Sequence, residues 1–114
     1  MSNEFHLLID DFREFDVDHI AKNAREGQKA LLTFPVTHLY MDHDLGDENE
    51  PTGYDVIVWA IGRECVPAHV MMVTSNPVGR DNMVAALENI GYTKKGNWYV
   101  QGIITDIGDK NDNS

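Results

Sequence analysis

The chain has 114 residues, 42% of them hydrophobic, which is enough to bury one core but not two. Its 19 acidic and 9 basic residues give a formal net charge of −10, which argues against binding to extended nucleic acid. No apolar stretch approaches the roughly 20 residues that span a bilayer, and Cys65 is the only cysteine. We therefore expect a cytoplasmic protein without membrane contact.

The N-terminal part of the chain predicts two strands. Residues 5–10 form a short apolar run that ends in acid, which is typical of a central parallel strand buried on both faces. A turn follows, and residues 18–22 can form a second, weaker strand.

The next segment predicts a helix over residues 24–33. Asn23 and Glu26 have the spacing of a capping box, and apolar residues along the segment can supply a buried face. An alternative interpretation joins residues 18–28 into one helix and makes residues 29–34 a strand. We rank that alternative second.

A strand over residues 37–42 comes next, followed by a loop rich in acids and turn formers. Thr52 or Gly53 then begins a helix over about 54–64, whose apolar residues form a wide stripe. Residues 69–74 make a further strand.

The C-terminal third predicts one more helix and a hairpin. The helix covers about 79–90, with Pro77 in its first turn and Ser75 or Asn76 as its cap. Two strands then follow around a Lys95-Gly96-Asn97 turn, because no helical stretch separates the two halves. The single domain is expected to cover 1–107, and 108–114 to be a disordered acidic tail.

This order of elements predicts an α/β fold, a three-layer sandwich with a mainly parallel central sheet and a C-terminal β-hairpin. In such sheets, ligands bind beyond the carboxyl ends of the strands. Three polar segments, at residues 10–11, 42–44 and 74–76, follow predicted strands directly. We expect them to meet at one edge of the sheet.

Two of these segments carry carboxylates. Asp10 and Asp11 follow the first strand, and Asp42 and Asp44 follow the strand at 37–42. Carboxylates that converge at one edge repel each other unless a cation lies between them, so the pattern predicts a Mg²⁺ or Mn²⁺ site. The simpler alternative is that these residues cap turns and loops.

The third segment offers groups that hold an anion. Ser75, Asn76 and Arg80 supply a hydroxyl, an amide and a guanidinium near a helix start. Arg80 could instead pair with an acid of its own helix, and Ser75 or Asn76 could serve only as the cap. A metal beside an anion site indicates phosphate chemistry.

Four segments carry a resemblance to a known family. LLIDDFR, MDHDLG, TGYDVIVWA and TSNPVGRDNM are similar to the cyclic-phosphate-processing receiver family, related to response regulators, over about Phe5 to Met83. The resemblance implies a receiver-like (flavodoxin-like) fold and an active site. Its candidate residues are Asp10, Asp11, Arg13, Asp42, His43, Asp44, Ser75, Asn76 and Arg80.

The leading hypothesis is a metal-dependent phosphoesterase that acts on a cyclic phosphate, either a cyclic nucleotide or an RNA 2′,3′-cyclic end. In this hypothesis the metal ligands are Asp10, Asp11 and Asp42, or Asp44 in place of Asp42. The group that moves protons is His43 or Asp44. The substrate phosphate would contact Ser75, Asn76, Arg80 and Arg13.

Two alternatives remain. The domain could be a non-catalytic module that binds a phosphorylated nucleotide or a protein partner. It could also be a receiver that accepts a phosphoryl group on Asp42. The chain lacks an obvious lysine at the end of the following strand and lacks a final helix, so relay from a kinase is not expected.

Overall fold

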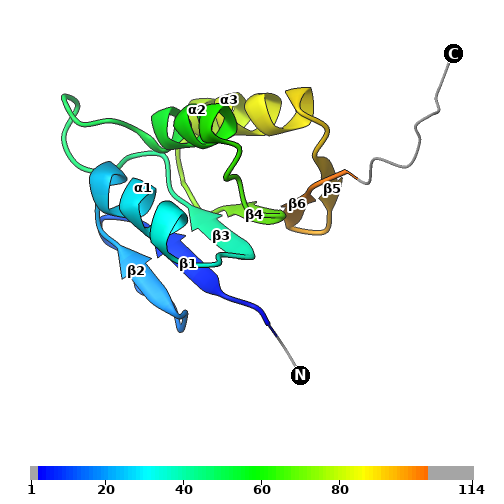
Figure 1. The fold of residues 1–114 in the computed structure, drawn as a ribbon. Helices are drawn as coiled ribbons and strands as arrows, with labels where there is room; N and C mark the ends of the chain where they lie inside the picture. The colour runs from blue at the N-terminus through cyan, green and yellow to red at the C-terminus, as the bar shows by residue number, and fades with distance from the viewer. Residues whose placement is uncertain (1–2, 103–114) are drawn as a thin grey trace, which may run out of the picture.

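The computed structural model describes residues 3–102, which form six strands and three helices (Figure 1). The expected domain end at residue 107 and the tail at 108–114 lie outside these residues. In chain order the elements are β1 (His6–Ile9), β2 (His19–Ala21), α1 (Ala24–Thr33), β3 (His38–Met41), α2 (Gly53–Arg63), β4 (His69–Met72), α3 (Pro77–Asn89), β5 (Thr93–Lys95) and β6 (Trp98–Val100).

All six strands belong to one sheet with the order β2-β1-β3-β4-β6-β5. β2, β1, β3 and β4 are parallel, whereas β6 pairs antiparallel with both β4 and β5. Gly96, in the turn between β5 and β6, has a φ of 63°, a left-handed conformation that glycine adopts without strain. The predicted mainly parallel sheet with a C-terminal hairpin is confirmed.

Local capping explains where the helices begin. The Asn23 side chain accepts a hydrogen bond from the Glu26 N–H at 2.8 Å, so α1 covers the predicted residues 24–33. The second-ranked alternative, a strand at 29–34, is wrong because most of that segment lies in α1. Among residues 3–102, no helix is long and apolar enough to cross a membrane.

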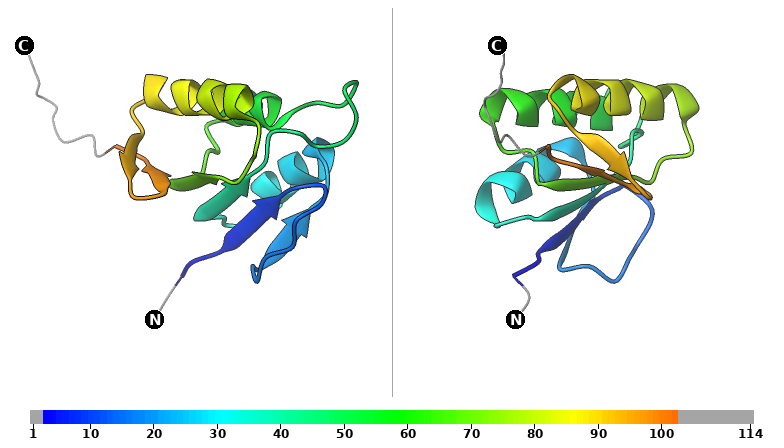
Figure 2. Two further views of the ribbon diagram at one scale, coloured as in Figure 1. Left: turned by 180° about the vertical axis from the view of Figure 1, so that it is seen from behind. Right: turned by 90° about the vertical axis from the view of Figure 1, so that its right-hand side faces the viewer.

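The three helices pack on the same face of the sheet. One core cluster contains the alternate strand residues Leu7 and Ile9 of β1 and Leu39 and Met41 of β3, together with buried residues from every helix. α2 contacts both α1 and α3, and Figure 2 shows the helices lying together above the sheet. Among the described residues, no helix covers the opposite face of the sheet, where the expected sandwich has its third layer.

Side chains and a loop cover the other face. The segment at residues 10–18 links β1 to β2 without a helix, and its Phe15 ring packs edge-on against Tyr40 of β3 at 5.8 Å. Leu8 of β1 is fully buried on this side, away from the core cluster beneath the helices. Aromatic and imidazole rings thus replace the helices of a third layer.

The start of α2 packs tightly against the loop after β3. The Gly53 N–H donates to the His43 carbonyl at 2.7 Å, and a Cβ on Gly53 would overlap the Asp42 carbonyl oxygen. Backbone cannot move aside as a flexible side chain can, so this position requires glycine. The contact fixes the backbone from which the Asp42 side chain projects.

Gly53→Ala should destabilise the protein by about 2 kcal/mol, in the range of other overpacked sites. Gly62→Ala, in the same helix, is the matched control because nothing lies within 4 Å of its added Cβ. That change should stabilise by about 0.5–1 kcal/mol through helix propensity. Urea denaturation of both variants measures the difference, and equal effects would contradict the close approach.

Candidate functional site

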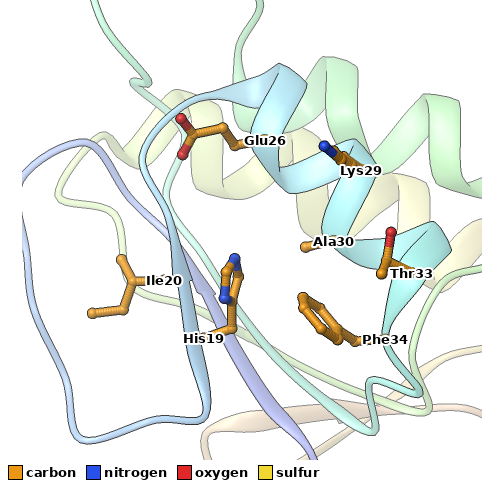
Figure 3. Close-up of a pocket in the computed structure, with 7 residues that line it drawn as sticks. All are labelled: His19, Ile20, Glu26, Lys29, Ala30, Thr33 and Phe34. Carbon is orange, nitrogen blue, oxygen red and sulfur yellow. The ribbon is translucent and has the colours of Figure 1, made fainter.

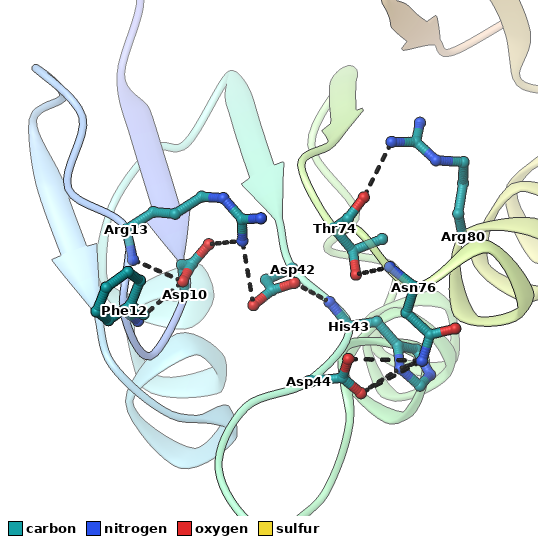
Figure 4. A network of polar contacts seen from close by, with 9 residues as sticks. All are labelled: Asp10, Phe12, Arg13, Asp42, His43, Asp44, Thr74, Asn76 and Arg80. Atoms are coloured by element: carbon teal, nitrogen blue, oxygen red, sulfur yellow. Dashed lines mark hydrogen bonds and ion pairs between the residues drawn. The ribbon is translucent and has the colours of Figure 1, made fainter.

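Polar side chains meet at the carboxyl ends of the three central strands (Figure 4). Asp10 follows β1 directly, Asp42 follows β3 directly, and Thr74 comes just beyond β4. The strands are parallel and adjacent, so their ends place these three residues side by side. All three are buried. The convergence expected at this edge of the sheet is present.

Asp10 organises the turn that follows β1. Its Oδ1 accepts hydrogen bonds from the backbone N–H groups of Phe12 at 2.9 Å and Arg13 at 2.8 Å. Its Oδ2 accepts from the Arg13 guanidinium at 3.0 Å. The side chain is 0% exposed, and three donors replace the water that it loses.

Asp42 lies in a less favourable environment than Asp10. Its Oδ1 accepts from the His43 N–H at 2.8 Å, and its Oδ2 is 3.7 Å from the Arg13 guanidinium. Burial raises the pKa of the Asp42 carboxyl, and the neighbouring Asp10 carboxylate raises it further. Hydrogen bonds from His43 and Thr74 and the charge of Arg13 oppose this rise only in part.

Asp10, Asp11 and Asp42 form an acidic cluster that could hold a metal ion. One carboxylate oxygen from each residue lies within 4.8 Å of the others. Asp10 and Asp42 are buried, whereas Asp11 is exposed and opens the cluster to solvent. Oxygen ligands at this spacing suit a hard divalent cation, and such an ion would offset the repulsion between the Asp10 and Asp42 carboxylates that contributes to the raised pKa of Asp42. The residues fit the predicted metal.

Arg13 brings positive charge to the acidic cluster. Its guanidinium contacts both Asp10 and Asp42, and the hydrogen bond to Asp10 is the largest cause of a raised Arg13 pKa. We predicted Arg13 as a ligand of the substrate phosphate, and the structure places it on the carboxylates. Its side chain is 36% exposed and so is also accessible from solvent.

His43 and Asp44 form a separate pair, on the side of Asp42 that faces α3 (Figure 4). The His43 Nδ1 is 3.0 Å from Asp44 Oδ1, and a carboxylate can only accept. The proton is therefore assigned to Nδ1, which leaves a lone pair on Nε2. A Cβ on Gly79 would overlap the imidazole, so the ring lies flush against the first turn of α3.

The third predicted segment is split among different roles. Asn76 is the N-cap of α3, because its Oδ1 accepts from the Gly79 N–H at 2.9 Å, and its amide also reaches Asp44 at 3.4 Å. Ser75 is exposed at the same turn. Arg80 donates to the Thr74 carbonyl at 3.1 Å and points away from the acidic cluster (Figure 4).

Thr74 is the contact that our sequence interpretation did not select. It is 4% exposed, its side chain hydrogen-bonds Asp42, and its hydroxyl oxygen accepts from the Asn76 N–H at 3.0 Å. The period of two that buries Val70 and Met72 in β4 also buries Thr74. Continuing this alternation beyond the end of β4 would have predicted that Thr74 is buried and Ser75 is not.

Two hollows lie away from the acidic cluster. One of about 300 Å³, between β2 and α1, is lined by His19, Lys29 and Phe34 among others (Figure 3). Another of about 450 Å³ contains Arg80 and Lys94. Neither includes a residue of the acidic cluster, nor does a third hollow, of about 390 Å³, lined by Arg25 and Glu50 among others.

Comparison with solved structures identifies the class of fold. The MaeR response regulator bound to beryllium trifluoride is similar, with a TM-score of 0.51, and the match covers 81% of this chain and 85% of that one. At 19% sequence identity this likeness shows the fold alone, which is that of a receiver domain. No curated protein matches the chain.

The family is shown by its sequence model. The model described as the cyclic-phosphate processing receiver domain matches residues 5–89, most of the chain. The chain belongs to this family, and the resemblance carried by the four sequence segments is confirmed.

Replacement of Asp42 by asparagine should stabilise the metal-free protein at neutral pH. The folded pKa of Asp42 is raised, so protonation favours folding. That contribution is complete below the ordinary carboxyl pKa and is lost as pH rises through the folded pKa. The gain from Asp42→Asn should therefore grow over the same pH range, as measured by urea denaturation in EDTA.

Asp10→Ala is the variant to compare with Asp42→Asn, because it leaves the Arg13 guanidinium and two backbone N–H groups without their hydrogen-bond acceptor. It should destabilise by about 3 kcal/mol, as other broken buried pairs do. A loss of stability in Asp42→Asn equal to that in Asp10→Ala would contradict the difference between the two carboxyls.

Proposed function

We propose that this chain is a Mg²⁺- or Mn²⁺-dependent phosphoesterase that hydrolyses a cyclic phosphate. The substrate class is a small phosphorylated ligand, either a cyclic nucleotide or the 2′,3′-cyclic end of an RNA. One observation carries the proposal: a member of a cyclic-phosphate processing family gathers three carboxylates within 4.8 Å at the carboxyl edge of its sheet. Extended nucleic acid and membranes are not the proposed partners.

Charge balance supports a metal at the acidic cluster. The chain has a formal net charge of −10, and a phosphorylated ligand would be repelled by the bare carboxylates. Asp10, Asp11 and Asp42 would hold the cation, and a cation there polarises the phosphoryl group and lowers the pKa of a bound water. Arg13 is the cationic side chain in contact with this cluster and supplies further charge for the phosphate.

His43 and Asp44 would move the proton. The Asp44 carboxylate accepts the Nδ1 hydrogen and orients the ring, so the Nε2 lone pair can take a proton from water. The water oxygen bonds to phosphorus, one ester P–O bond breaks, and the leaving oxygen receives a proton. The product is a phosphomonoester, and the atoms of one water are consumed.

The turn between β4 and α3 would bind the phosphate. Ser75 presents an exposed hydroxyl there, and Asn76 fixes the turn by capping α3 while its amide contacts Asp44. Arg80 is left out of the proposed phosphate site, because its guanidinium is bonded to the Thr74 carbonyl and lines a different hollow.

Incubation with a panel of cyclic phosphates and Mg²⁺ or Mn²⁺, read by mass spectrometry, tests the activity. We expect a gain of one water by one class of substrate, dependence on added metal, and no turnover in Asp42→Asn. Glu88→Gln, at the exposed far end of α3, is a matched control that should retain full activity. Activity retained in Asp42→Asn would remove the acidic cluster as the metal site.

His43→Gln should lower kcat by about 10²- to 10⁴-fold, which is the usual contribution of a general acid or base. Ligand affinity should change little, and the pH profile should lose one limb. His19→Gln is the control, because His19 packs on Phe34 at the distant hollow between β2 and α1. An unchanged kcat in His43→Gln would exclude the imidazole from the chemistry.

A second candidate function is a non-catalytic receiver-like module that binds a phosphorylated nucleotide or a protein partner. The contacts of Arg13 favour it, because a guanidinium on Asp10 and Asp42 balances part of their charge without any metal. Saturable ligand binding without product in the same incubation would support this function. A covalent adduct on Asp42 after treatment with acetyl phosphate and Mg²⁺ would instead indicate a phosphoacceptor.

A further inference from the structure

Three histidines form a row on the face of the sheet opposite the helices. His6, His38 and His69 are the first residues of β1, β3 and β4, and each is directly paired with the next in register. Their rings stack with centroids 4.4 Å and 4.3 Å apart and with interplanar angles of 8° and 9°. Side chains in register on neighbouring parallel strands point the same way, so the three imidazoles lie next to one another on this face.

His6 is bonded at both ring nitrogens. Its Nε2 is 3.0 Å from Glu4 Oε1, and its Nδ1 is 2.8 Å from the Tyr40 hydroxyl. The largest cause of the lowered Glu4 pKa is its hydrogen bond with His6, so the carboxylate is ionised and accepts from Nε2–H. Tyr40, whose pKa is raised by burial, keeps its proton and donates to Nδ1.

His38 is held as the complementary tautomer. The Thr37 hydroxyl donates to the Phe5 carbonyl at 3.2 Å, so it accepts from His38 Nδ1 at 2.8 Å. The ring hydrogen is thereby assigned to Nδ1, and the Nε2 lone pair is available as a ligand. A metal-bound histidine is commonly oriented in this way, through its other ring nitrogen.

We propose that Glu4, His6 and His38 form a second metal site, for a transition-metal ion of the Zn²⁺, Co²⁺ or Ni²⁺ class. One carboxylate oxygen and one ring nitrogen from each histidine lie within 4.8 Å of one another. Two imidazoles and a carboxylate are the ligand types that such ions favour, whereas the all-oxygen acidic cluster suits Mg²⁺. The two sites therefore differ in the ion that they select.

Binding requires one hydrogen of His6 to move. The ion takes the place of the Nε2 hydrogen that now joins His6 to Glu4, and this hydrogen shifts to Nδ1. The Tyr40 hydroxyl oxygen then accepts it, so the imidazole stays neutral and no net proton is released from the ring. Glu4 and His6 exchange a hydrogen bond for a shared ion. Because the lone pair of a ring nitrogen lies in the plane of its ring, the His6 and His38 rings must also turn out of their parallel stack to share that ion.

The remaining rings form the walls of the site. His69 stacks on His38, and Trp98 of β6 meets His38 edge-on at 5.1 Å. The His69 Nδ1 is buried without a hydrogen-bond partner among the described residues.

The two sites lie at opposite ends of the same strands. His6 begins β1 and Asp10 follows its last residue, so four residue steps of about 3.3 Å separate their backbones by roughly 13 Å. A side chain of one site therefore does not reach an ion in the other. Excess Mg²⁺ can occupy the acidic cluster during a titration and leave the histidine row accessible.

Titration of untagged protein with Co²⁺ in excess Mg²⁺, read by visible absorbance, tests the proposal, with calorimetry repeating it for Zn²⁺. We expect one equivalent of Co²⁺ and an absorbance band from imidazole and carboxylate ligands. His38→Gln should weaken binding at least about 100-fold and Glu4→Gln about tenfold. His19→Gln, a histidine outside the row, should bind as the wild type does.

Two outcomes would overturn the proposal. One is the absence of saturable Co²⁺ and Zn²⁺ binding by the wild type, and the other is unchanged binding in both His38→Gln and Glu4→Gln. Glu4 lies on the partly exposed N-terminal segment before β1, so its variant reports on the site even where His38→Gln disturbs the fold. The N–H tautomer of His38, observed by ¹⁵N spectroscopy, is an independent readout.

Discussion

Mutual repulsion between two buried carboxylates, at the ends of adjacent parallel strands, is the constraint on which this structure depends. Asp10 and Asp42 are brought together by the pairing of β1 with β3, and neither can turn away without leaving the core. Arg13 folds back from the loop to contact both, and Asp10 in turn holds the loop backbone. Burial and the neighbouring Asp10 carboxylate raise the pKa of Asp42, and the clustered carboxylates are the ligand type that a hard divalent cation prefers.

The two faces of the sheet are covered differently. Helices seal one face with aliphatic contacts, while a short loop and a layer of rings cover the other. A row of imidazoles can lie on that second face because rings tolerate partial contact with water. The lack of a helix between β1 and β2 is therefore what makes a histidine row possible at the amino ends of the strands.

Local signals predicted the elements well and the directions of side chains poorly. The α1 boundaries followed from Asn23 and the residues near it, because capping involves neighbours in sequence. The gathering of Asp10 and Asp42 followed from strand order. The positions of Arg13 and Arg80 did not, since a long side chain chooses among partners that only the folded chain supplies. Whether Thr74 or Ser75 is the buried residue depended on how far the alternation of buried and less buried side chains continues beyond β4.

The contact between His43 and Gly79 ties the proposed proton carrier to a different element. A hydrogen atom on the α3 backbone leaves the space that the imidazole fills, and a methyl group there would overlap the ring. The orientation of the His43 ring therefore depends on Gly79 of α3 as well as on the loop that carries His43. A change of the first turn of α3 at Gly79 would therefore alter the space in which the His43 ring lies, without touching the loop that carries it.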